Sequence, residues 1–215
     1  MRRSQSYNSF ARFVPILLVI IITIVVIAAI IAIGRALFGG ETQQTQTTTT
    51  TDAGRDALLS TDVNRAVRVT VRGPIVAQEK FRSYRVMASP QARSMVTYEG
   101  YMDKQLDAKQ LDNNPKAYEE LVYALEKRKM MEGRQLSDAQ NDLRGICATG
   151  KVYIFETLYN GQPVKTLWTS DCSGSKGSAV ASTEEIIDMI LKQIPDGSKM
   201  ASSVGLYQKE NFFRL

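Results

Sequence analysis

The sequence contains no histidine and only two cysteines in 215 residues, and these shortages exclude several classes of chemistry. Without imidazole, the chain cannot form a Ser–His–Asp triad, a histidine-ligated metal site or a histidine pH switch. Two thiols are too few for four-cysteine zinc sites or four-thiolate iron–sulfur clusters. A Ser/Lys pair, paired carboxylates or a thiol remain available, and we predict no cofactor.

The excess of basic over acidic residues is also small. The chain carries 27 Lys and Arg against 22 Asp and Glu, which gives a formal net charge of +5. This excess is too small to indicate a nucleic-acid-binding protein, so specific nucleic-acid binding is not supported. The hydrophobic content of 44% and the charged content of 23% are typical of a globular protein and exclude a wholly disordered chain.

One long apolar run, Val14 to Gly34, contains no charged residue. As a helix it would span about 31 Å, which matches a hydrocarbon core of roughly 30 Å. A cleavable signal peptide is the alternative, but its apolar region is usually only about 7–15 residues long. Arg2, Arg3 and Arg12 precede the run and Arg35 follows it, so the positive-inside rule places the N-terminus in the cytoplasm. We therefore predict an uncleaved membrane anchor.

This anchor divides the chain into four segments. We predict a cytoplasmic tail over residues 1–12, a transmembrane helix over 13–38, a flexible linker over 39–53 and an extracytoplasmic domain over 54–215. The linker is rich in Thr and Gln and lacks the apolar residues needed for packing. The predicted partner of residues 13–38 is the lipid bilayer.

The outer segment predicts an α+β domain in which a largely antiparallel sheet packs against two or three helices. Val67, Val69 and Val71 alternate with polar residues, which is typical of a half-buried strand. Asn160-Gly161 is a preferred pair for a hairpin turn. Strands are predicted over residues 66–72, 81–88, 94–101, 152–159 and 164–169.

Helix signals follow from capping residues and apolar spacing. Asn114 can cap a helix that begins at Pro115, and an apolar stripe continues from Tyr118 to Leu125. Capping-box patterns start at Ser137 and Ser182. We predict helices from Asn114 to Gly133, from Ser137 to Gly145 and from Ser182 to Pro195, with a helical turn over residues 56–60.

Several segments together resemble a class of envelope protein. A basic N-terminus, an Ile/Val span, a Gly-Arg exit and a Thr/Gln stalk are followed by Arg144–Gly150 and Leu167–Ser175. These features are similar to uncharacterised single-span envelope proteins of Saccharibacteria-type candidate-phyla bacteria. The resemblance implies a location in the cell envelope and carries no catalytic or binding residue over to this chain.

The two cysteines flank the predicted hairpin, Cys147 before it and Cys172 after it. Because both lie in the segment predicted to be outside, a disulfide that clamps the two ends of the hairpin is favoured. Two buried, reduced thiols are the alternative. A redox-active pair is disfavoured because the spacing is not C-x-x-C.

Ser173 and Lys176 fit S-x-x-K, in which a lysine amine activates a serine nucleophile in penicillin-binding-type enzymes. The companion motifs are missing, because no S-D-N occurs and Lys165-Thr166 is followed by leucine rather than glycine. The motif should also open a helix, whereas this one falls in a predicted loop. We favour a solvated loop and assign no catalytic residue and no metal site.

The segment from residue 65 to residue 93 is rich in arginine, and Glu79 is its one acid. Arg68 and Arg72 share the strand face opposite the valines, with Thr70 between them. If the second strand pairs alongside, Arg82 or Arg85 extends this face. An ordinary solvated sheet face is favoured over a specific anion-binding strip, which is the alternative. The candidate anion-binding residues are Arg65, Arg68, Arg72, Arg82 and Arg85.

The function that these features favour is non-enzymatic: a membrane-anchored extracytoplasmic binding or scaffolding protein of the cell envelope. Its expected partner is an anionic envelope polymer or an envelope protein. One alternative is a Ser/Lys hydrolase that acts on cell-wall material through Ser173 and Lys176. Another is a pilin-like component, although the leader glycine and the early helix glutamate of pilins are missing here.

Overall fold

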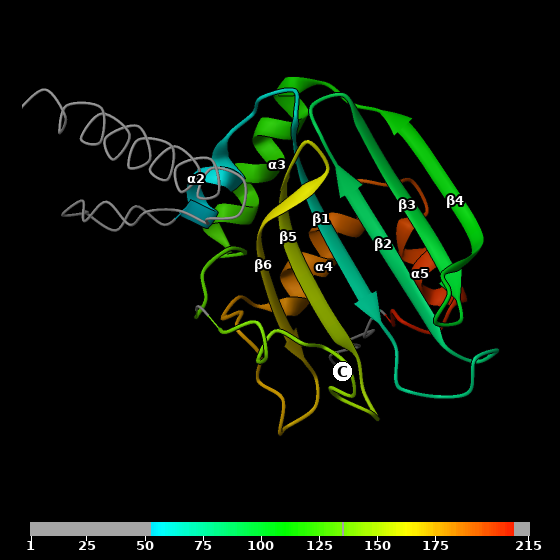
Figure 1. Ribbon diagram of the computed structural model, residues 1–215. Coiled ribbons are helices and arrows are strands. Elements are labelled where there is room, and N and C mark those ends of the chain that lie inside the picture. Colours follow the sequence, from blue (N-terminus) through cyan, green and yellow to red (C-terminus); the bar gives the residue numbers. More distant parts are fainter. Residues whose placement is uncertain (1–52, 135, 209–215) are drawn as a thin grey trace, which may run out of the picture. The chain divides into compact units, whose positions relative to one another are not determined.

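The computed structural model describes residues 53–134 and 136–208 (Figure 1). The predicted tail, membrane helix and nearly all of the linker lie outside the described residues. Within residues 53–134 and 136–208, no helix has the length and apolar character needed to cross a membrane.

The predicted α+β class is confirmed. A six-stranded antiparallel sheet has the order β4-β3-β2-β1-β5-β6, so β1 (Arg65–Arg72) lies between β2 (Arg82–Ala88) and β5 (Val152–Tyr159). The outer strands are β3 (Ala92–Glu99), β4 (Lys104–Asp112) and β6 (Gln162–Ser170). The β5–β6 hairpin forms around Asn160 and Gly161, both at positive φ, as the turn signal predicts.

Strand β4 was not predicted. Its sequence, KQLDAKQLD, lacks β-branched and aromatic residues and shows no clear alternation of apolar and polar side chains. It pairs with β3 alone and is mostly exposed, so backbone pairing at the sheet edge creates it rather than burial of its side chains. Its lysines and aspartates are typical of an edge strand that resists further pairing.

The helices pack on one face of the sheet. Figure 1 shows α4 (Thr183–Leu191) and α5 (Gly197–Ser203) behind the strands. The core cluster joins α3 (Pro115–Lys127) to the same face and includes Leu58 of α2 (Ala53–Leu59). The buried side chains of α3 are Tyr118, Leu121, Val122 and Leu125.

Helix α3 begins as predicted and ends early. Asn114 caps it, since the Asn114 side chain accepts a hydrogen bond of 2.9 Å from the Ala117 N–H. The helix ends at Lys127, not at Gly133, because Lys129 takes a left-handed conformation with φ of 61°. The chain then turns inward, and two buried methionines, Met130 and Met131, join the core.

Two other helix predictions need correction. The Ser137 segment forms no helix, although its capping contact exists: the Ser137 N–H donates to Gln140 Oε1 at 3.1 Å. The contact stabilises a turn instead of the start of a helix. Helix α4 ends at Leu191 rather than at Pro195, and α5 was not predicted.

A second, smaller core forms on the other face of the sheet. Val152, Trp168 and Cys147 are buried there, and residues of the 136–150 segment pack against them. This segment covers parts of β5 and β6 on that face and leaves uncovered the neighbouring surface of β1, β2 and β3, together with Glu156 of β5. We call this uncovered surface the open face.

Replacement of Phe155 by alanine should lower the free energy of unfolding by about 3–5 kcal/mol, because a fully buried ring leaves a cavity. The measurement is denaturant unfolding of the full chain in a non-ionic detergent. Val164→Ala is the control, since Val164 is 47% exposed and its loss should cost less than about 0.5 kcal/mol. Equal losses for both variants would contradict the core assignment.

Candidate functional site

Alternation along β1 and its register with β2 build the candidate site. Val67, Val69 and Val71 are all 0% exposed, so the intervening residues of β1 point to the open face. Thr70 pairs with Arg85, and Arg72 pairs with Ser83. The two arginines therefore lie on one diagonal of a square and the two hydroxyls on the other. We call Thr70, Arg72, Ser83 and Arg85 the quartet.

A pocket of about 320 Å³ lies over the quartet. This volume is at the lower end of the range of small-molecule sites. Tyr98 of β3, Phe81 and Tyr101 provide its aromatic lining, and Ile154 and Glu156 of β5 also line it. The lining therefore combines cations, hydroxyls and rings.

Arg68 borders this pocket with its charge already balanced. Its Nε and an Nη donate to the two carboxylate oxygens of Glu156 at 2.5 and 2.8 Å. These hydrogen bonds raise the pKa of Arg68, against the opposing effect of burial. Because a bidentate pair satisfies both partners, Arg68 forms a fixed wall of the pocket rather than a free cation.

Arg72 has no such partner. Among the described residues, no carboxylate oxygen lies within 4.0 Å of its guanidinium, which sits over the Phe81 ring at 5.7 Å from the centroid. Phe81 is 3% exposed and stacks on Tyr101 with a centroid distance of 4.2 Å. The aromatic pair therefore orients Arg72 without neutralising it.

Arg85 is only loosely paired. Its guanidinium lies over the Tyr98 ring at 5.5 Å, and the carboxylate of Asp103 is 4.0 Å away. Its Nε is buried and, in the described part of the chain, has no hydrogen-bond partner. Two guanidinium groups with unused donors thus face one pocket.

Hydrogen bonds fix the aromatic wall of the pocket. The Tyr101 hydroxyl donates to the Val76 carbonyl at 2.7 Å and accepts from the Val76 N–H at 3.0 Å. The Tyr101 N–H donates to Gln78 Oε1 at 3.0 Å. The β1–β2 loop and the β3–β4 turn are therefore joined, and both hold the Phe81–Tyr101 stack in place.

The structure gathers some of the candidate arginines and separates others. Arg68, Arg72 and Arg85 share the open face. Arg65 lies on the side of the valines, with its guanidinium over the Tyr159 ring at 4.7 Å. Arg82 also belongs to that side by alternation, and it pairs with Glu99 at 3.0 Å. Of the two alternatives on β2, Arg85 extends the face.

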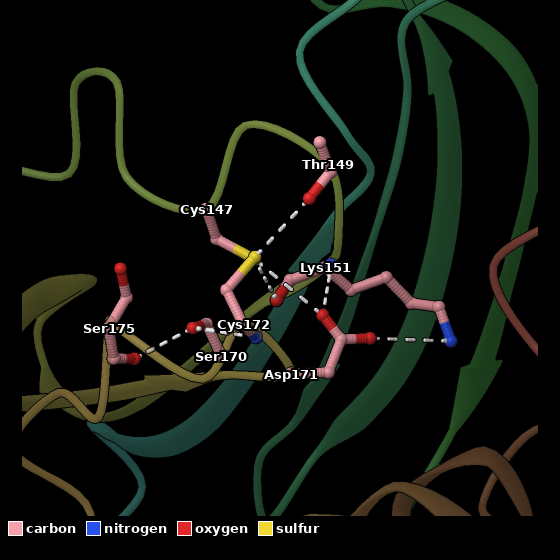
Figure 2. The surroundings of a disulfide bond; sticks show 7 residues. All are labelled: Cys147, Thr149, Lys151, Ser170, Asp171, Cys172 and Ser175. Carbon is pink, nitrogen blue, oxygen red and sulfur yellow. Dashed lines mark hydrogen bonds and ion pairs between the residues drawn. A yellow bond between two sulfur atoms is a disulfide. The ribbon is translucent and has the colours of Figure 1, made fainter.

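The predicted disulfide is confirmed. Cys147 and Cys172 are joined with a Cα–Cα distance of 5.4 Å, where β5 begins and β6 ends (Figure 2). Asp171 accepts a hydrogen bond from the Lys151 N–H beside the bridge. The carbonyl of Ala148 accepts from the Ile75 N–H at 2.8 Å, which connects this region to the β1–β2 loop of the pocket.

The ligand atoms of Cys147, Asp171 and Cys172 lie within 4.8 Å of one another, a grouping that suits a metal ion. Coordination by cysteine requires thiolates, whereas both sulfurs here are bonded to each other. The oxidised pair is therefore a structural clamp.

Ser173 and Lys176 are both exposed in the loop between β6 and α4, and no helix begins at Ser173. Within the described residues, no hydrogen bond joins the serine hydroxyl to the lysine amine. The loop is shaped instead by the Ser170 hydroxyl, which donates to the Ser175 carbonyl at 2.7 Å. This environment differs from the helix start that S-x-x-K chemistry uses.

No protein-family model matches the chain, and no curated protein matches it. The interpretation of the pocket therefore depends on its own geometry.

Sequence reasoning missed several pocket residues. Ser83, Tyr98 and Glu156 reach the pocket through strand pairing, and no local pattern gives the register of β1 with β2 or β5. The acid-poor stretch around β1 gave the only signal, and it identified the arginines without their partners.

Replacement of both cysteines by serine should lower the free energy of unfolding by about 3 kcal/mol, because the bridge closes a loop with a sequence separation of 25. Denaturant unfolding measures this loss. Peptide mapping without reductant should find one cross-linked Cys147–Cys172 pair. Free alkylation of both thiols in the native protein would rule out the clamp.

Proposed function

We propose that the protein is a single-pass, membrane-anchored extracytoplasmic binding protein whose pocket takes an anionic polymer of the cell envelope. In this proposal residues 13–38 form the anchor and the N-terminus is cytoplasmic. The observation that carries the binding role is the pair Arg72 and Arg85, two oriented cations with unused donors in one pocket.

The charge balance of the pocket supports an anionic ligand. Three guanidinium groups line it, and the carboxylates of Glu156 and Asp103 oppose them. Glu156 is fully engaged by Arg68, and Asp103 is only at the limit of ion-pair distance from Arg85. Positive charge that is held by stacked rings and lacks an internal partner favours an anion from outside.

The pocket reaches one end of the central strands. Helix α2 packs against α3 and contacts β1, β5 and β6. Arg72 ends β1, Phe81 directly precedes β2 and Tyr101 follows β3, so all three lie at the end of the sheet away from the start of β1.

Binding of this kind should depend steeply on salt, because each cationic contact replaces a counterion. The full chain in a maltoside detergent is applied to immobilised poly(glycerol phosphate) and to a neutral glucan across a salt series. We expect retention on the anionic polymer that falls as salt rises, and none on the glucan. Equal retention on both polymers, or binding that ignores salt, would reject the proposal.

The anchor and its orientation have a separate test. Protease added to intact spheroplasts should degrade the domain after residue 53, while the protein stays in the membrane fraction after an alkaline carbonate wash. The reasons are the apolar run before Arg35 and the arginines ahead of it. Digestion of the domain only in inverted vesicles would show that the domain lies on the cytoplasmic side.

A further inference from the structure

We infer that the quartet is a phosphate site, and that the ligand is a phosphodiester group in the backbone of a polyol-phosphate polymer. This inference rests on the proposed function and adds the chemical class of the ligand and the atoms that recognise it. Thr70, Arg72, Ser83 and Arg85 supply all the donors.

The register brings four donors around one point. Directly paired residues on antiparallel strands have Cβ atoms about 5 Å apart, and diagonal neighbours are about 7–8 Å apart. Arg72 and Arg85 occupy one diagonal of the quartet, and Thr70 and Ser83 occupy the other. A small oxyanion above the centre of this square is within reach of two guanidinium groups and two hydroxyls.

Most donors of the quartet are unused, and the one ion-pair partner is Asp103, 4.0 Å from Arg85 among the described residues. Within the described residues, neither the Thr70 hydroxyl nor the Ser83 hydroxyl makes a hydrogen bond, and the Arg72 guanidinium makes none. The Nε of Arg85 is buried without a partner. The two hydroxyls and the Arg72 guanidinium can therefore donate to an incoming oxyanion without giving up a hydrogen bond within the protein.

The arrangement fits phosphate better than carboxylate. A phosphodiester has two charged non-bridging oxygens and two ester oxygens arranged tetrahedrally around phosphorus, whereas a carboxylate has only two oxygens, both in one plane. Arginine forks match phosphate oxygens and add geometric specificity. The quartet therefore offers two arginine forks and two hydroxyls to the oxygens of a phosphodiester, more donor groups than the two oxygens of a carboxylate use.

The rings of the pocket argue against nucleic acid as the source of the phosphate. Recognition of single strands depends on free aromatic faces on which bases stack. Phe81 is 3% exposed, and Tyr98 carries the Arg85 guanidinium over its ring. These rings orient the arginines, so the ligand needs a phosphate backbone with small polar units and no base.

The test measures the affinity of the full chain, in a maltoside detergent, for glycerol phosphate and for poly(glycerol phosphate). The double variant R72Q/R85Q should bind both probes at least about tenfold more weakly, because it removes two charge-assisted contacts. The double variant T70V/S83A should lose about two- to tenfold with its charge unchanged.

A matched control separates the site from the overall charge. K80Q/K176Q removes the same two positive charges from exposed positions, and Lys80 lies close to the pocket in the β1–β2 loop. We expect an affinity change of less than about twofold at moderate salt, since exposed charges are screened. Denaturation midpoints near that of the wild type will show that the variants are folded.

The outcomes distinguish this inference from the proposed function. If K80Q/K176Q weakens binding to the polymer as much as R72Q/R85Q does, the quartet is rejected as the binding site, and the proposed function still stands. Glycerol phosphate binding at the quartet without polymer binding would keep the site and reject the polymer role.

Three further arms test the ligand class. The probes are polygalacturonate, duplex DNA and vesicles of an anionic phospholipid. If any of them binds through Arg72 and Arg85 as tightly as poly(glycerol phosphate), the assignment to a polyol phosphate is overturned. No binding of any probe by the wild-type chain would reject both proposals.

Discussion

Burial of the β1 valines is the constraint on which the open face depends. Val67, Val69 and Val71 can all enter the core in only one of the two strand orientations, and a slip by one residue would bury Arg68 and Arg72 instead. Burial of the valines fixes the face on which Arg68, Thr70 and Arg72 lie, and the pairing of β1 with β2 and β5 decides which residues stand beside them. Core packing and strand register together thus place the quartet and the Arg68–Glu156 pair.

The two faces of the sheet are stabilised differently. The helices bury one face in a single apolar core, whereas the disulfide-linked segment covers only β5 and β6 on the other. Ile154 belongs to both regions of the second face, because it packs in the smaller core and lines the pocket. The hydrogen bond between Ile75 and Ala148 also links the two regions. These links hold the strands beneath the pocket in place, so Arg72 and Arg85 can occupy fixed positions on the open face.

Local signals predicted the parts of the fold that local physics determines. The alternation of β1, the Asn160-Gly161 turn and the Asn114 cap each act within a few residues, and the structure contains all three. Strand β4 has no such signal, because pairing with β3 creates it. The Ser137 cap shows the reverse case, in which a local contact forms without a helix. The partner of Arg68 was equally hidden, since Glu156 is 88 residues away.

The binding role of the quartet is tested most directly by an NMR titration that follows the Nε–H signals of the arginine side chains as glycerol phosphate is added to the full chain. The signals of Arg72 and Arg85 should shift together and saturate. That of Arg68 should stay nearly unchanged, because Glu156 already occupies its donors. Shifts spread evenly over exposed arginines such as Arg55 and Arg144, without saturation, would contradict a phosphate site on the open face.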